Sequence, residues 1–222
     1  MLKTFVFFNL FLISFFSTSQ SDLGAWYMSF NTVKFGERWQ FQNDIQYRSF
    51  NFGNDLEQLM LRGGFGYNLT ENNNNLLQGY AFIRSGELGL VDESTETRIN
   101  EHRLYQQFIT KQQFGRFYIA HRYRLEERFI GDLFKIRFRY FLNMKVALSQ
   151  PKIGSNTLYA AFYNEIFVHG QGVLFDRNRL YGAMGFSFSP KTRIEVGMMA
   201  QLYQNTYRPQ LQLGFFKTLD FR

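Results

Sequence analysis

The stretch Arg116–Val146, RFYIAHRYRLEERFIGDLFKIRFRYFLNMKV, determines the fold we expect for this chain. Apolar side chains occupy most alternate positions on both sides of Ile130–Asp132, with His121 and Glu127 as exceptions, and charged or polar side chains fill most positions between them. Phe141 is the exception on the polar side. Side chains alternate between two faces only in an extended strand, so the stretch predicts a long hairpin with one apolar face and one strongly charged face.

The length of the two predicted strands indicates a membrane. Each has about twelve residues or more, whereas strands of soluble sheets have about five or six and a tilted strand needs roughly nine to eleven to cross a bilayer. An arginine facing lipid at the midplane costs about 2–4 kcal/mol, so Arg122, Arg124 and Arg128 would face the interior. A soluble sheet with its apolar face in the core shows the same alternation. The hairpin alone therefore does not distinguish a membrane protein from a soluble one, and the rest of the sequence is needed.

Composition favours one strand-rich domain. The chain has 222 residues, 19% of them aromatic, with 28 Phe and 13 Tyr, which favours strands. Its formal charge of +7 is spread over alternating positions and forms no single patch, so we expect no nucleic-acid partner. The absence of cysteine excludes disulfides and a lipid-modified cysteine anchor.

The N-terminus is typical of a signal peptide. Lys3 supplies the positive charge, Phe5–Phe16 is an apolar run, and Ser17–Ser19 provides small residues before a cleavage site. The apolar run is shorter than the roughly twenty residues of a membrane-spanning helix, although an uncleaved anchor is the alternative. We therefore expect a signal peptide at Met1–Ser19 and a single β-barrel domain over residues 20–222.

The alternating pattern recurs along the chain, and with the two strands of the hairpin it predicts ten strands. The other eight are Arg38–Phe50, Gln58–Leu69, Leu76–Arg84, Ile99–Thr110, Thr157–Val168, Arg179–Phe188, Thr192–Tyr203 and Gln210–Phe221. Leu23–Val33 is a weaker eleventh candidate. Because single-chain bacterial barrels have even strand numbers, we predict an all-β, antiparallel up-and-down transmembrane barrel of ten strands, with twelve as the alternative and Leu23–Val33 as an extra segment at the seam. The apolar face would point outward, around a charged lumen.

Several motifs resemble a known family: Glu101-His102-Arg103 with Gln107, Arg122–Arg128, Arg137–Tyr140, Asn164-Glu165 and Phe175–Arg179. From Trp26 onward the chain resembles the "domain of unknown function 2490" proteins, which are outer-membrane-barrel-like and frequent in Bacteroidetes. The last strand, with Phe221 before the final Arg222, is similar to the C-terminal signature of such barrels. The resemblance implies a location in the bacterial outer membrane, with its lipid bilayer and the barrel-assembly machinery as partners, and it implies no activity.

The candidate site is the set of charged side chains on the face that we expect to line the lumen. The set comprises Glu101, Arg103, Arg122, Arg124, Glu126, Arg128, Arg137, Arg139, Glu165, Arg179, Arg193 and Glu195. One interpretation is structural, with arginines paired to carboxylates in a narrow barrel. The other is a narrow anion-favouring pore or binding barrel, since cations outnumber carboxylates in the set.

Two further functions are alternatives. A soluble exported lipocalin-like barrel would turn the Phe and Leu face inward around an apolar ligand. An outer-membrane lipid hydrolase would need a catalytic histidine; His102 and His121 fall on the apolar face without a serine two positions away, which leaves His169 beside Gly170. We expect no enzymatic activity, and the absence of metal and phosphate-binding motifs predicts no metal and no cofactor.

Overall fold

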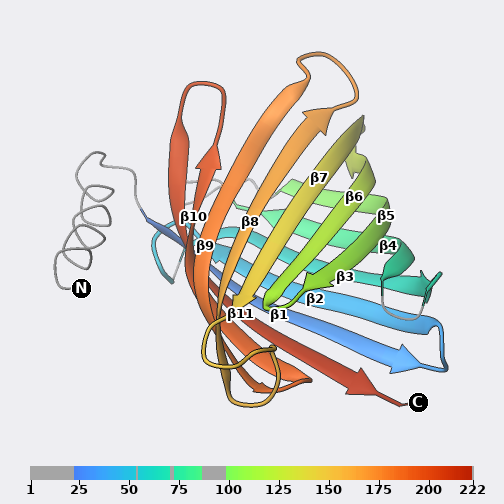
Figure 1. Cartoon of the computed structure of the whole chain (residues 1–222). Coiled ribbons are helices and arrows are strands. Elements are labelled where there is room, and N and C mark those ends of the chain that lie inside the picture. The colour runs from blue at the N-terminus through green and yellow to red at the C-terminus, as the bar shows by residue number, and fades with distance from the viewer. Residues whose placement is uncertain (1–22, 54, 71–72, 87–98, 222) are drawn as a thin grey trace, which may run out of the picture.

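The computed structural model of the chain describes residues 23–53, 55–70, 73–86 and 99–221. The expected signal peptide, Met1–Ser19, lies outside the described residues. Strands dominate the described part, and they form one closed barrel (Figure 1). The described part contains no helix long and apolar enough to cross a membrane.

In the part that the structure describes, eleven strands follow one another along the chain. They are β1 (Gly24–Phe35), β2 (Trp39–Ser49), β3 (Leu56–Asn68), β4 (Asn74–Ser85), β5 (Ile99–Phe114), β6 (Phe117–Ile130), β7 (Leu133–Ala147), β8 (Thr157–His169), β9 (Phe175–Ser189), β10 (Thr192–Leu202) and β11 (Tyr207–Asp220).

The strand order corrects the prediction of ten strands. Each strand pairs antiparallel with the next, and β1 closes the barrel by pairing parallel with β11, from Gly24↔Gln210 to Lys34↔Asp220. An odd number of strands makes the first and last strands run in the same direction, so the closing pair has to be parallel. The segment that we expected beside the seam is therefore a full member of the wall, and the prediction of a purely antiparallel barrel was wrong at this pair.

The central hairpin is confirmed as β6 and β7. Cross-strand pairs run from Phe117↔Val146 to Ile130↔Leu133, leaving Gly131-Asp132 as a two-residue turn. Gly131 has a φ of +54°, a conformation that side-chain-bearing residues rarely adopt and that hairpin turns with glycine at the first loop position require. The same pairing places the polar positions of both strands side by side on one face of the sheet.

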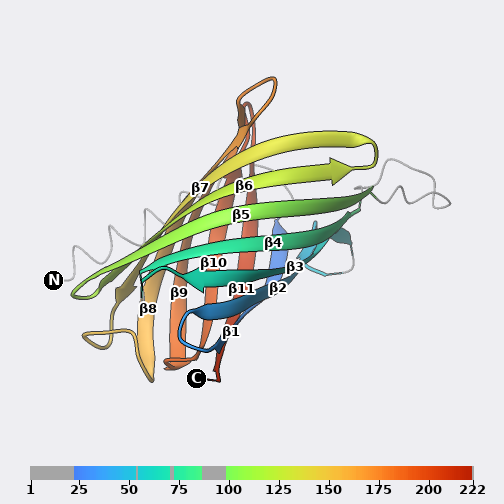
Figure 2. The same cartoon turned by 90° about the vertical axis from the view of Figure 1, so that its right-hand side faces the viewer.

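Opposite walls of the barrel cross steeply. In Figure 2 strands β2–β7 run across the view, whereas β8–β11 stand upright behind them. Side chains of strands that are not neighbours also meet inside the β8–β11 wall: the Tyr159 hydroxyl on β8 donates to Glu195 on β10 at 2.9 Å, and Gln212 on β11 donates to the Tyr163 hydroxyl on β8 at 3.0 Å. The interior is thus crowded with side chains.

The two faces of the wall differ sharply in chemistry. Charged side chains of β5–β9, such as Arg103 and Glu126, are buried inside, whereas large apolar residues such as Phe138 and Phe162 are exposed outside. Strand β1 departs from this pattern, because Trp26 and Met28 point inward and Ser29 then alternates to the outside. This inverted polarity gives the charged interior one apolar side.

Candidate functional site

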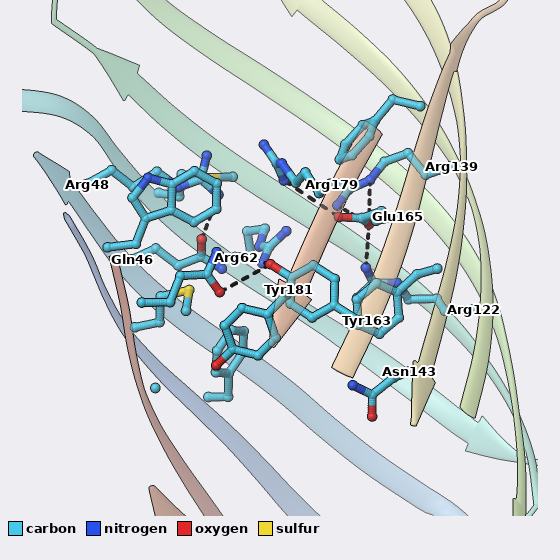
Figure 3. A pocket seen from close by; sticks show the side chains of 18 of the residues that line it. Gln46, Arg48, Arg62, Arg122, Arg139, Asn143, Tyr163, Glu165, Arg179 and Tyr181 are labelled. Atoms are coloured by element: carbon cyan, nitrogen blue, oxygen red, sulfur yellow. Dashed lines mark hydrogen bonds and ion pairs between the residues drawn. The ribbon is translucent and has the colours of Figure 1, made fainter. Parts of the chain in front are cut away.

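A cavity of about 370 Å³ lies inside the barrel and is the candidate functional site (Figure 3). Its wall carries ten cationic side chains but only three carboxylates, which are Glu101, Glu165 and Glu195. The carboxylates of Asp44, Glu126 and Asp176 pair with these cations from beside the cavity, and the cations still predominate. The cations on the wall are Arg48, Arg62, Arg103, Arg122, Arg128, Arg137, Arg139, Lys145, Arg177 and Arg179.

Glu126, on β6, is one centre of the ion-pair network. Its side chain is fully buried, and its carboxylate lies 2.6 Å from Arg139 Nη1, 2.7 Å from Arg137 Nη2 and 3.4 Å from Arg103 Nη1. These arginines come from the two strands that flank β6, because the antiparallel registers place inward positions of β5, β6 and β7 next to one another. One buried carboxylate therefore compensates several guanidinium groups, which a charge-assisted, two-oxygen acceptor can do.

Glu165, on β8, is the second centre. Figure 3 shows Arg122, Arg139 and Arg179 directed toward it, and the shortest distances from its oxygens are 2.7, 2.5 and 3.6 Å respectively. Arg139 contacts both this carboxylate and that of Glu126, so it joins the two centres. The network consequently links β5 to β9 along one continuous side of the interior.

Two further carboxylates extend the network toward the barrel ends. Glu101 lies 2.7 Å from both Arg103 and Arg128, near the turn after β6. At the other end, Glu195 accepts from Lys145 at 3.0 Å and lies 3.9 Å from Arg193. These pairs show that every carboxylate of the predicted set has at least one cationic partner.

Aromatic rings support several of the arginines. The guanidinium carbon of Arg48 lies 3.7 Å from the centre of the Trp26 ring, and that of Arg179 lies 4.8 Å from the same ring. Arg122 lies 4.4 Å from the ring of Phe141, the residue that interrupts the polar side of the central hairpin. An inward phenylalanine is therefore consistent with the charged face, since a cation over an aromatic ring is stabilised by the ring's electrons.

All twelve residues of the predicted set lie in this interior network. Nine line the cavity, while Arg124, Glu126 and Arg193 lie beside it. Four cationic residues of the cavity wall are not in the predicted set. A signal existed for three of them, because Arg48, Arg62 and Lys145 alternate on the polar faces of their strands. The fourth, Arg177, was missed because residues 169–178 were expected to form a loop, whereas β9 begins at Phe175.

The arrangement offers guanidinium donors that can hold anions, and the three histidines have the following partners. The rings of His102 and His121 lie 2.6 and 2.8 Å from the hydroxyls of Tyr80 and Tyr140. His169 Nε2 lies 3.9 Å from Asp176 Oδ1. Within residues 23–221, as far as they are described, no group of three or more histidine, aspartate and glutamate side chains is placed to hold a metal ion.

Comparison with known proteins gives one match. A family model described as "Protein of unknown function (DUF2490)" matches residues 23–212. No curated protein and no solved structure matches the chain. The match covers ten strands completely and about half of β11, so it includes the whole cavity wall apart from Gly214 and Phe216.

Proposed function

We propose that this chain, which belongs to the DUF2490 family of proteins of unknown function, is a barrel of the bacterial outer membrane. Its cation-rich interior would favour anions over cations. The observation that carries the proposal is the division of the wall, with exposed apolar side chains around the outside and a surplus of buried cations inside. The signal-peptide pattern at Met1–Ser19 supports the export that such a location requires.

The outer wall supports the membrane location, whereas the eleven strands differ from the even number of single-chain bacterial barrels. On five consecutive strands the outward residues Tyr80, Leu104, Tyr123, Phe138 and Phe162 are each 40–51% exposed. Soluble monomers rarely expose contiguous apolar patches larger than a few hundred Å², whereas lipid chains would cover a wall of this kind. The strands have 11–16 residues, enough for the roughly nine to eleven that a tilted strand needs to cross the hydrocarbon layer.

The inner wall supports the preference for anions. The cations that line the cavity outnumber its carboxylates by ten to three. Fixed charges of one sign in a low-dielectric enclosure concentrate ions of the opposite sign, and rings of Arg and Lys select anions in pores. We therefore infer that small anions enter or bind in the interior in preference to cations.

Fractionation and conductance test the two parts of the proposal separately. The mature chain should be extracted from outer membranes only with detergent, and recovery in the soluble periplasm would contradict the membrane location. In planar bilayers with a KCl gradient, any current should be carried mainly by chloride, measured as the sign of the reversal potential. Equal permeation of potassium and chloride would contradict the preference for anions and would leave the location unaffected.

The soluble apolar-ligand barrel has less support. It requires Phe and Leu side chains inside, and the structure instead places Leu104, Phe138 and Phe162 outside and arginines inside. The hydrolase alternative would depend on His169, whose closest charged partner is Asp176. Hydrolysis of phospholipid vesicles that disappears in His169→Ala would replace our proposal with an enzymatic function.

A further inference from the structure

Arg48, on β2, is a buried cation whose hydrogen-bond partners are uncharged amides. Its residue is only 7% exposed, and it lines the cavity. Its two terminal nitrogens donate to the amide oxygens of Gln58 and Gln46, each at 2.8 Å. No carboxylate of the described residues forms an ion pair with it, and its Nε has no hydrogen-bond partner there. Glu57 acts on it only through space and pairs with Arg208 at 3.2 Å. A buried charge without an ion-pair partner is costly, so an anion in the cavity would stabilise this site.

A second guanidinium group approaches the same aromatic ring as Arg48. Arg179 and Arg48 both approach the ring of Trp26, at 4.8 and 3.7 Å. Arg179 donates to the amide oxygen of Gln201 at 2.8 Å, and its distance of 3.6 Å from Glu165 is long for an ion pair. Each of the two arginines is held by an amide and by the same aromatic ring, and a guanidinium group is a donor suited to a carboxylate or a phosphate.

The side of the cavity next to these arginines is apolar. Trp26, Tyr181 and Met199 form a buried cluster, with Met28 and Tyr163 packed against it. The rings of Tyr163 and Tyr181 are stacked with centres 4.5 Å apart, and Figure 3 shows both within the lining of the cavity. An inorganic anion would leave this surface unused, whereas the apolar body of an organic anion would cover it.

We propose that the cavity binds a small organic oxyanion, a carboxylate or phosphate monoester with an aromatic or compact apolar body. The acid group lies against Arg48 and Arg179, and the body packs on Trp26, Tyr163 and Tyr181. The volume of about 370 Å³ falls at the lower end of small-molecule pockets, which limits the body to roughly one ring. The inference rests on the proposed function, because it takes the same cation-rich cavity as an anion site and specifies the ligand class.

Tryptophan fluorescence tests the inference on the full mature chain in an uncharged detergent. The chain has two tryptophans, and Trp39 is 51% exposed, so Trp39→Phe leaves Trp26 as the reporter inside the cavity. Phenyl phosphate, inorganic phosphate and benzyl alcohol serve as the probes. Inorganic phosphate has the acid group without the ring, and benzyl alcohol has an aromatic ring without the acid group. We expect phenyl phosphate to bind about tenfold more tightly than either, since it uses both parts of the site.

The comparison of probes separates the two proposals. Equal binding of inorganic phosphate and phenyl phosphate would overturn the inference and leave the preference for anions intact. Binding of benzyl alcohol as tight as that of phenyl phosphate would overturn both the inference and the preference for anions. If no probe binds, the inference is wrong, and the conductance experiment remains the test of the proposed function.

Two variants locate the halves of the site. Arg48→Gln should weaken phenyl phosphate binding by about tenfold or more, whereas Arg38→Gln, in the exposed turn before β2, should leave it unchanged. Tyr181→Leu should reduce the preference for phenyl phosphate over inorganic phosphate and preserve phosphate binding. If Arg48→Gln and Arg38→Gln bind alike, or if Tyr181→Leu keeps the full preference, the assignment is wrong.

Discussion

At the scale of single residues, neighbouring positions on one strand have opposite environments. Glu126 is fully buried and lies within 3.5 Å of Arg103, Arg137 and Arg139. The next residue, Glu127, alternates to the outer face and forms no ion pair with the other described residues. A glutamate therefore holds the buried ion-pair network together at position 126 and lies on the outer face at position 127.

This contrast predicts the effect of neutralising each glutamate. Glu126→Gln keeps the shape of the side chain but leaves several buried arginines without their counter-charge, and losing one partner of a buried ion pair costs about 3–5 kcal/mol. Glu127→Gln is the matched control, with an expected change within about 0.5 kcal/mol. The free energy of unfolding in urea, measured on detergent-solubilised protein, checks both. Equal stability of the two variants would mean that the buried carboxylate does not organise the interior.

At the scale of elements, β1 closes the barrel. It hydrogen-bonds β2 on one edge and β11 on the other, in antiparallel and parallel registers respectively. Its inward residues Trp26 and Met28 supply the apolar side of the cavity. The strand that was hardest to assign therefore both closes the wall and shapes the candidate site.

Cysteine pairs test this closure, since the chain has no cysteine of its own. Ser29 and Phe215 are Cα partners across the β1–β11 seam, so Ser29→Cys with Phe215→Cys should form a disulfide on oxidation, seen as faster migration on a non-reducing gel. Ser29→Cys with Val196→Cys is the control, because β11 separates their strands and cysteines whose Cα atoms are more than about 7 Å apart cannot be bridged. A barrel closed by β2 against β11 would show no seam disulfide.

At the scale of the whole molecule, the barrel is arranged opposite to a soluble protein. Arginines and glutamates fill the interior, and aromatic and aliphatic residues cover the exterior. In the outer-membrane location that we propose, this arrangement would remove the apolar wall from water and leave the charges facing one another. The cost of the buried charges is reduced because each carboxylate centre has several hydrogen-bonded partners.

An arginine on the outer wall should therefore impair insertion. Phe162, near the middle of β8, is 45% exposed on the outside, and Phe162→Arg should cost about 2–4 kcal/mol of stability in lipid if it lies near the midplane. Leu174→Arg, in the loop between β8 and β9, is the control and should cost about 1 kcal/mol or less. Folding yield into lipid vesicles under increasing urea checks both. Similar yields would argue against lipid contact at the wall.

Much of the fold and of the candidate site followed from the sequence. A two-residue period is a local property of the extended backbone, so the central hairpin, nine further strands or parts of them, and the inward face with its twelve charged residues could be assigned without any knowledge of distant contacts. The start of β9 was missed because Gly170 and Gly172 suggested a longer loop than the one that forms, residues 170–174.

The sequence by itself therefore determined the period, the chemistry of the two faces and the family resemblance. Only the tertiary structure decided which strands pair to close the barrel and which partner each buried charged side chain has. Closure depends on the register between β1 and β11, which are nearly the whole chain apart in sequence. That Arg48 has amide partners while Glu126 has several arginines depends on distances across the interior, because electrostatic pairing is set by separation in space and not by order along the chain.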